Sequence, residues 1–210
     1  MEDKMVVMDR KERDKQLRKA DILRAAEHVF ASKGYYEATI QDIAKEAQYG
    51  TGTVYLYFKD KNALYFSLLE EKMKNLTNVA KEKTEHINDA RKKLEVFIQE
   101  SLIFFEQNQS FFRIYMVEKN NIQLIVGKKT LESSRAVGHA TEYVGKLIRT
   151  AQEQNVIKKN FSPSDLADIL AAIMGSMILN WTKVGSKKAR GLSDKAGYIF
   201  DMFLNGVGTK

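Results

Sequence analysis

Hydrophobic residues recur every three to four positions along most of this chain, the spacing of amphipathic helices. Two short runs of this kind lie within residues 39–61. The first begins at Thr39, whose hydroxyl can cap a helix, and Asp42 is placed to complete a capping box. Its inward face comprises Ile40, Ile43, Ala44 and Ala47. After a turn at residues 48–50, Val54 and Phe58 mark the inward face of the second run. The pattern predicts two short helices joined by a tight turn.

The outward positions of the second run are uncharged, which is unusual for a helix that faces water. They are Thr51, Gly52, Thr53, Tyr55, Leu56 and Tyr57. Small residues allow close approach to DNA, hydroxyls can bond to phosphates or bases, and an apolar group can contact a thymine methyl. The set therefore suits a helix in a DNA major groove. On spacing alone, a helical hairpin packed in a core explains it equally well.

The rest of the pattern predicts an all-α protein. The first expected helix ends near residue 32. Beyond the two short helices, further helices are expected over residues 61–86, from residue 90 onward, and over residues 130–154, 164–184 and 193–205. Gly34 is a suitable stop for the first helix, Asp60 is a suitable cap for the helix at residues 61–86, and Ser162-Pro163-Ser164-Asp165 is a clear helix start. Few stretches alternate as strands do.

One set of positions over residues 22–69 resembles the N-terminal signature of the tetracycline-repressor (TetR/AcrR) family of bacterial regulators. The matching residues are Thr39, Ile43, Ala44, Ala47, Gly52, Thr53, Tyr55, Tyr57, Phe58, Lys61 and Leu64. The departures are Gln48, Tyr49 and Gly50, where the family usually has glycine, valine and a serine-like cap. Glutamine tolerates a left-handed backbone less well than glycine, and Gly50 is a weaker cap than serine, so local turn geometry is where this chain should differ.

The resemblance implies a three-helix helix-turn-helix head in residues 1–60, with residues 1–14 mobile, and a helical-bundle domain for ligand binding and dimerisation in residues 61–210. It implies a homodimeric regulator, most often a repressor, that a small ligand releases from a palindromic operator. The implied DNA-contacting residues are Thr39, Gln41, Thr51, Gly52, Thr53, Tyr55, Leu56, Tyr57 and Lys61. Tyr55, Tyr57 and Lys61 are expected at phosphates. A helical-bundle enzyme and an architectural DNA-binding protein without effector are the alternatives.

The aromatic and methionine residues beyond residue 90 are compatible with a helical core or with an apolar ligand cavity. The resemblance favours the cavity, with lining residues Phe97, Phe104, Phe112, Tyr115, Met116, Tyr143, Met174 and Met177. An apolar or amphipathic effector fits such a lining, for example a drug-like compound or a fatty acyl thioester. Residues 52–59 also resemble fatty-acid-metabolism repressors of this family, although that stretch lies in the DNA-binding part.

The helix expected at residues 164–184 is apolar nearly all round, so it must be buried on several sides. A second subunit is the natural cover for one side, and a central helix in a monomer is the alternative. The expected dimer interface consists of Val144, Leu147, Ile148, Ile173, Ile178 and Trp181.

Composition narrows the function further. The chain has 210 residues, of which 44% are hydrophobic and 29% charged, and no cysteine. No apolar run approaches the ~20 residues that span a bilayer, and the charged N-terminus lacks the apolar segment of a secretion signal. We therefore expect a cytoplasmic protein with no membrane partner. No Ser/His/Asp set, Glu-x-x-His pair or glycine-rich phosphate loop is present, so we expect no enzymatic activity, no metal site and no cofactor.

The charge distribution supports DNA binding only locally. The net charge is +7, yet residues 1–70 hold 12 Lys and Arg against 12 Asp and Glu. Within them lies a basic N-terminal run of Arg10, Lys11, Arg13, Lys15, Arg18 and Lys19. Such residues can neutralise phosphates and give salt-dependent affinity without sequence information. A frayed, solvated helix end is the alternative for this run.

Overall fold

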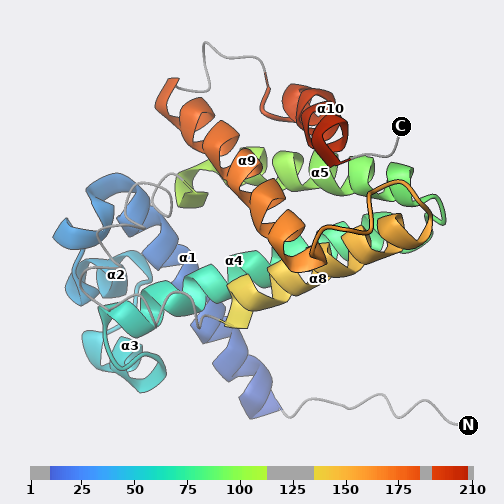
Figure 1. Ribbon diagram of the computed structural model, residues 1–210. Coiled ribbons are helices and arrows are strands. Elements are labelled where there is room, and N and C mark those ends of the chain that lie inside the picture. The colour runs from blue at the N-terminus through green and yellow to red at the C-terminus, as the bar shows by residue number, and fades with distance from the viewer. Residues whose placement is uncertain (1–9, 113–134, 185–190, 208–210) are drawn as a thin grey trace, which may run out of the picture. The chain divides into compact units, whose positions relative to one another are not determined.

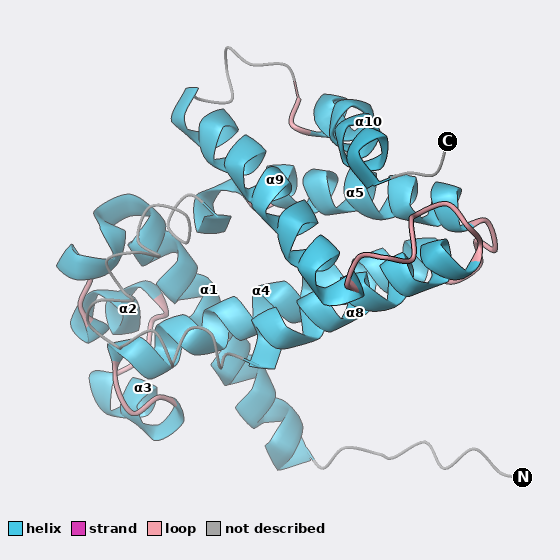
Figure 2. Ribbon diagram, in the orientation of Figure 1, coloured by secondary structure: helices cyan, strands magenta, loops and turns pink. Residues whose placement is uncertain are grey.

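The computed structural model describes residues 10–112, 135–184 and 191–207, and the elements there are helices (Figures 1 and 2). They are α1 (Arg10–Glu37), α2 (Ile40–Glu46), α3 (Thr51–Tyr57), α4 (Lys61–Thr84), α5 (Ala90–Gln107), α8 (Arg135–Glu153), α9 (Pro163–Val184), the 3-10 turn η1 (Ser193–Lys195) and α10 (Ala196–Val207). The all-α prediction is confirmed. Of the stretch expected to be mobile, residues 1–9 lie outside the described residues and residues 10–14 belong to α1.

Contacts divide the chain into two compact units, Met1–Leu68 and Leu69–Lys210. Our boundary at residue 60 followed the start of α4. In the structure α4 is one continuous helix whose first two turns belong to the N-terminal unit and whose remainder belongs to the C-terminal unit. Each unit has its own apolar core.

The core of the N-terminal unit follows the predicted helical spacing. Its buried side chains include Ile22, Ala26, Val29 and Phe30 of α1, Ile40, Ile43 and Ala44 of α2, Val54 of α3, and Leu64, Tyr65 and Leu68 of α4. Gly34 leaves helical geometry with φ 79° and ψ 167°, as expected of a glycine that ends a helix, and a further turn follows it. Leu17 is exposed because the first half of α1 extends beyond this core.

In the C-terminal unit α8 packs on α9, and α10 packs on α5. Buried side chains at this core include Leu94, Ile98 and Leu102 of α5, Ile148 and Ala151 of α8, Leu166, Leu170 and Ile178 of α9, and Ile199 of α10. Helix α9 begins where the sequence predicted, and the Ser162 hydroxyl accepts from the Asp165 amide at 3.4 Å. One side of α9 is left open by the described residues, since Ile169, Ala172 and Ser176 are exposed.

Candidate nucleic-acid interface and ligand site

Helix α2 begins with the predicted capping box. The Thr39 hydroxyl accepts from the Asp42 amide at 3.1 Å, and the Asp42 carboxylate accepts from the Thr39 amide at 3.2 Å. Lys33 of α1 donates to the same carboxylate at 2.7 Å. The hydrogen bonds from Lys33 and then Thr39 lower the pKa of Asp42 from 3.8 to about 2. The start of α2 is thereby fixed to α1.

The turn between α2 and α3, where we expected this chain to differ from the family, contains a left-handed residue that is not glycine. Gln48 adopts a left-handed backbone with φ 58°, a conformation that glycine adopts with less strain. Gly50 is the N-cap of α3 in an extended conformation and supplies no side-chain hydrogen bond. The Tyr49 hydroxyl donates to the Asp21 carboxylate at 3.2 Å, and this bond ties the turn to α1.

Helix α3 is a short anchored helix with an exposed, uncharged outer surface. Val54 is fully buried and Phe58, its C-cap, is nearly so, whereas Leu56 is 83% exposed and Tyr55 53% exposed. Thr51 and Gly52 are exposed, as are Thr39 and Gln41 on α2, and Thr53 and Tyr57 are half-buried. A Cβ atom built on Gly52 meets no heavy atom within 4 Å. This surface can therefore approach another molecule closely.

Lys61, predicted at a phosphate, is used differently in the structure. Its ammonium donates to the backbone carbonyls of Tyr35, Tyr36 and Ala38 at 2.8, 3.0 and 2.8 Å and lies 4.7 Å from the centre of the Tyr35 ring. Burial lowers the pKa of Lys61. An ammonium has three donors, and all three are used here. We therefore correct the phosphate assignment to a role in holding the start of α4 against the α1–α2 corner.

A second contact reinforces the same corner. The Tyr35 hydroxyl donates to the side-chain oxygen of Asn62, the residue after Lys61. Burial, followed by the nearby Asp60 charge, raises the pKa of Tyr35 to about 12, so this hydroxyl keeps its proton at any physiological pH. The first turn of α4 is thus bonded to the residues that precede α2.

The basic run lies on the exposed first half of α1. Lys19 lies at its inner end, with its ammonium 5.9 Å from the centre of the Phe58 ring. Since Phe58 follows the last residue of α3, the run starts beside the C-terminal end of that helix and continues outward along α1.

The predicted ligand-binding residues that the structure describes lie on different helices of the C-terminal unit. Phe104 and Phe112 are buried, and their ring centres lie 6.2 Å apart. Phe97 is also buried, and its ring centre lies 6.2 Å from that of Tyr143 of α8. On α9, Met174 is buried and Met177 half-buried. Tyr115 and Met116 lie outside the described residues.

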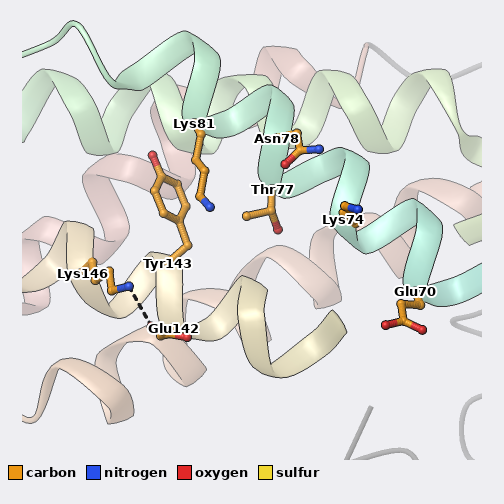
Figure 3. Close-up of a pocket in the computed structure, with 8 residues that line it drawn as sticks. All are labelled: Glu70, Lys74, Thr77, Asn78, Lys81, Glu142, Tyr143 and Lys146. Atoms are coloured by element: carbon orange, nitrogen blue, oxygen red, sulfur yellow. Dashed lines mark ion pairs between the residues drawn. The ribbon is translucent and has the colours of Figure 1, made fainter. Parts of the chain in front are cut away.

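A polar pocket of about 410 Å³ lies between α4 and α8 (Figure 3). Its lining comprises Glu70, Lys74, Thr77, Asn78, Lys81, Glu142, Tyr143 and Lys146. Among the predicted ligand residues, only Tyr143 lines it. The five residues from α4 follow one another at intervals of four, three, one and three positions, which places them on one helix face. This polar stripe can be read in the sequence, whereas the ligand site was predicted from apolar positions.

The predicted dimer residues are mostly buried within the single chain. They are Val144, Leu147, Ile148, Ile178 and Trp181, and Ile173 is half-exposed. Their place in a dimer interface stays a prediction. The apolar residues that remain exposed in this unit include Ile169 of α9 at 49%, and Tyr198 and Met202 of α10 at 59% and 46%.

Two further kinds of feature are absent from the described residues. No group of three or more His, Asp or Glu side chains there is arranged to hold a metal ion. No helix in the same ranges is long and apolar enough to cross a membrane.

The N-terminal unit has the geometry of a helix-turn-helix, the class of DNA-binding unit in which a first helix supports a second, exposed one. Residues 22–68 match the family model of bacterial regulatory proteins, tetR family. The N-terminal unit therefore carries the helix-turn-helix of the tetR family of bacterial regulators, as its sequence signature indicated.

Known relatives and solved structures agree with this assignment. The fatty acid metabolism regulator protein of Bacillus subtilis is 32% identical over 105 residues, which are 49% of this chain and 54% of that protein. The chain thus spans about half the length of the curated relatives it matches. A structure of the regulator FadR from Bacillus subtilis with stearoyl-CoA has a TM-score of 0.78 at 20% identity, covering 90% of this chain and 98% of that one. FadR from Bacillus halodurans gives the same TM-score and identity over 90% and 95%. At such identity these structures establish the fold.

Proposed function

We propose that this protein is a homodimeric, DNA-binding transcriptional regulator that an amphipathic ligand releases from a palindromic operator. The exposed, uncharged surface of α3 carries the proposal. Helix α3 is anchored by Val54 and Phe58, positioned by the capped α2, and lies in the segment that matches the family model.

The residues of this surface divide by chemistry into base and phosphate contacts. Gln41, Thr51, Thr53 and Leu56 offer hydrogen-bonding groups and one apolar side chain to base edges, and Gly52 allows close approach. Tyr55 and Tyr57 offer hydroxyls to phosphates. Thr39 is exposed as well, but its hydroxyl already donates to the Asp42 carboxylate at 2.8 Å. The basic run of α1 adds phosphate contacts outside the recognised bases, which contribute affinity but no sequence preference.

A dimer is inferred from the apolar surface that one chain leaves uncovered. Ile169 of α9 and Tyr198 and Met202 of α10 are large apolar side chains of the same unit that are exposed, and exposed apolar surface is what a second subunit would cover. Two identical heads read a palindrome because the protein and the DNA then share a twofold axis. We expect a dimer mass in sedimentation equilibrium and a shift to monomer in Ile169→Lys. A monomeric wild-type protein at micromolar concentration would refute this part.

The effector class is inferred from the C-terminal unit. Its aromatic core beside a charged pocket suits a molecule with an apolar chain and a polar head. A fatty acyl thioester has both parts, and the relatives whose names refer to fatty acid metabolism and to stearoyl-CoA support that choice over a drug-like compound. To switch a population from 99:1 to 1:99, the effector must favour one state by about 5.5 kcal/mol.

Fluorescence anisotropy with DNA from upstream of the protein's own gene tests the proposal. We expect tight binding to that DNA, at least about 10³-fold weaker binding to random DNA, and release on addition of stearoyl-CoA. Equal affinity for both DNAs would favour an architectural protein. Specific binding without release by stearoyl-CoA would support the proposed regulator but would rule out a fatty acyl thioester as its effector.

A further inference from the structure

The pocket between α4 and α8 is charged, although the core beside it is aromatic. Three lysines and two glutamates line it, together with Thr77, Asn78 and Tyr143. Because such a lining disfavours an apolar group, the pocket is suited to the polar part of a ligand.

The positive charges of the pocket are spread along its length. Lys74 and Lys81 lie two turns apart on α4, about 10.5 Å along the helix axis, with Thr77 and Asn78 between them (Figure 3). Across the pocket, Lys146 pairs with Glu142 at 2.7 Å, so the charges of that pair largely cancel. The Thr77 hydroxyl already donates to the Met73 carbonyl at 2.9 Å, so the Asn78 amide is the donor that lies between the two lysines. Two ammonium groups that flank an amide donor match the charge and oxygen atoms of a diphosphate or of two nearby phosphates.

Tyr143 stands at the boundary between the pocket and the core. Thr84 donates its single hydroxyl proton to the Ala80 carbonyl at 2.6 Å, so the Tyr143 hydroxyl is the donor in its 2.6 Å bond with Thr84. The ammonium of Lys81 lies 5.5 Å from the centre of the same ring, and the ring of Phe97 lies 6.2 Å from it, centre to centre. This one side chain therefore fixes α8 to α4, orients a lysine of the pocket and contacts the aromatic core.

We propose that the α4–α8 pocket binds the phosphate groups of an amphipathic ligand whose apolar chain enters the aromatic core next to Tyr143. The inference rests on the proposed function, because that ligand is the effector. Phosphates held by Lys74 and Lys81 from α4 and by residues of α8 link these two helices. Helix α4 is also the helix whose first turn Lys61 and Asn62 anchor, so the ligand acts on an element that belongs to both units.

The test compares two ligands with the same acyl chain and thioester, of which one carries phosphates. Stearoyl-CoA carries a phosphorylated adenosine diphosphate group, and S-stearoyl-pantetheine lacks that whole group, so the lysine variants separate the phosphate contribution from that of the adenosine. We measure binding of each to the full chain by isothermal titration calorimetry, with Lys74→Met and Lys81→Met as variants. Lys83→Met is the matched control, since Lys83 is an exposed lysine of α4 that does not line the pocket. Circular dichroism checks that each variant is folded.

We expect wild-type protein to bind stearoyl-CoA at least about 10-fold more tightly than the phosphate-free ligand. Each pocket variant should lose about 3- to 10-fold in affinity for stearoyl-CoA, as for partly exposed charge pairs, and nothing for stearoyl-pantetheine. Equal binding of both ligands, or an equal loss in Lys83→Met, overturns the pocket assignment and leaves the effector class intact. If neither ligand binds, the effector class fails and this inference fails with it.

Discussion

Replacing Gly52 by alanine separates the DNA-facing role of α3 from its role in the fold. The structure leaves open space at this position, because a Cβ atom there has no heavy atom of the protein within 4 Å. Alanine has a higher helix propensity than glycine, so Gly52→Ala should leave stability unchanged or raise it by up to about 1 kcal/mol. Any loss of DNA affinity then comes from the contact between α3 and DNA and not from a change in the fold.

The expected loss follows from the close approach that α3 makes in a major groove. A methyl group extends about 1.5 Å beyond the backbone surface of the helix. Inserting one into a well-packed contact costs about 1–3 kcal/mol, which corresponds to ~5- to ~150-fold in affinity. We expect operator affinity to fall within that range.

Two measurements on the same sample check this prediction: anisotropy titration with operator DNA and thermal unfolding. Gly206→Ala is the control, because Gly206 is a glycine of α10 that likewise has open space around a built Cβ. It should keep full DNA affinity. If Gly52→Ala binds the operator as tightly as wild type while folded, the N-terminal turn of α3 is not in close contact with DNA, and the reasoning fails.

Three further changes probe the supports of the helix-turn-helix. Gln48→Gly should raise the free energy of unfolding by about 1 kcal/mol in urea titration, because glycine removes the strain of a left-handed residue; a loss of stability would show that the Gln48 side chain matters more. Lys61→Met should lower the free energy of unfolding by about 1–3 kcal/mol, because three backbone carbonyls lose their donor, whereas Lys59→Met at an exposed lysine should not. Equal effects of the two substitutions would contradict the role of Lys61 in holding the start of α4. Asp42 has a lowered pKa, so its carboxylate contributes to stability above about pH 4, and that contribution is lost as pH falls toward about 2. Asp42→Asn should therefore flatten the dependence of the melting temperature on pH over that interval. An unchanged pH profile would argue against the capping box as the source of the dependence.

Local sequence patterns predicted the helix-turn-helix because its determinants are neighbours in the chain. The capping box joins Thr39 to Asp42, and the left-handed turn falls at Gln48. Both depend on residues within one or two turns of each other. The end of the helical run at Gly34 is of the same kind.

The features that the sequence did not predict depend on partners far along the chain. Lys61 was assigned to phosphate because nothing near it in sequence shows that the carbonyls of Tyr35, Tyr36 and Ala38 lie within reach. For the apolar residues of α8 and α9, helical spacing marks a buried face without showing whether the same chain or a second subunit covers it. In the pocket, α4 supplies a readable polar face, but its pairing with Glu142 and Lys146 of α8 is set by the fold.

Selection from a pool of random DNA tests the central claim most directly. Purified full-length protein is used to enrich binding sequences over several rounds, and the products are sequenced. We predict a palindromic consensus with two half-sites whose centres are separated by about one helical turn or a multiple of it, ~34 Å each, and loss of that consensus when Gln41 and Thr53 are both replaced by alanine. A pool that remains random, or a consensus without twofold symmetry that survives the double variant, would contradict the account.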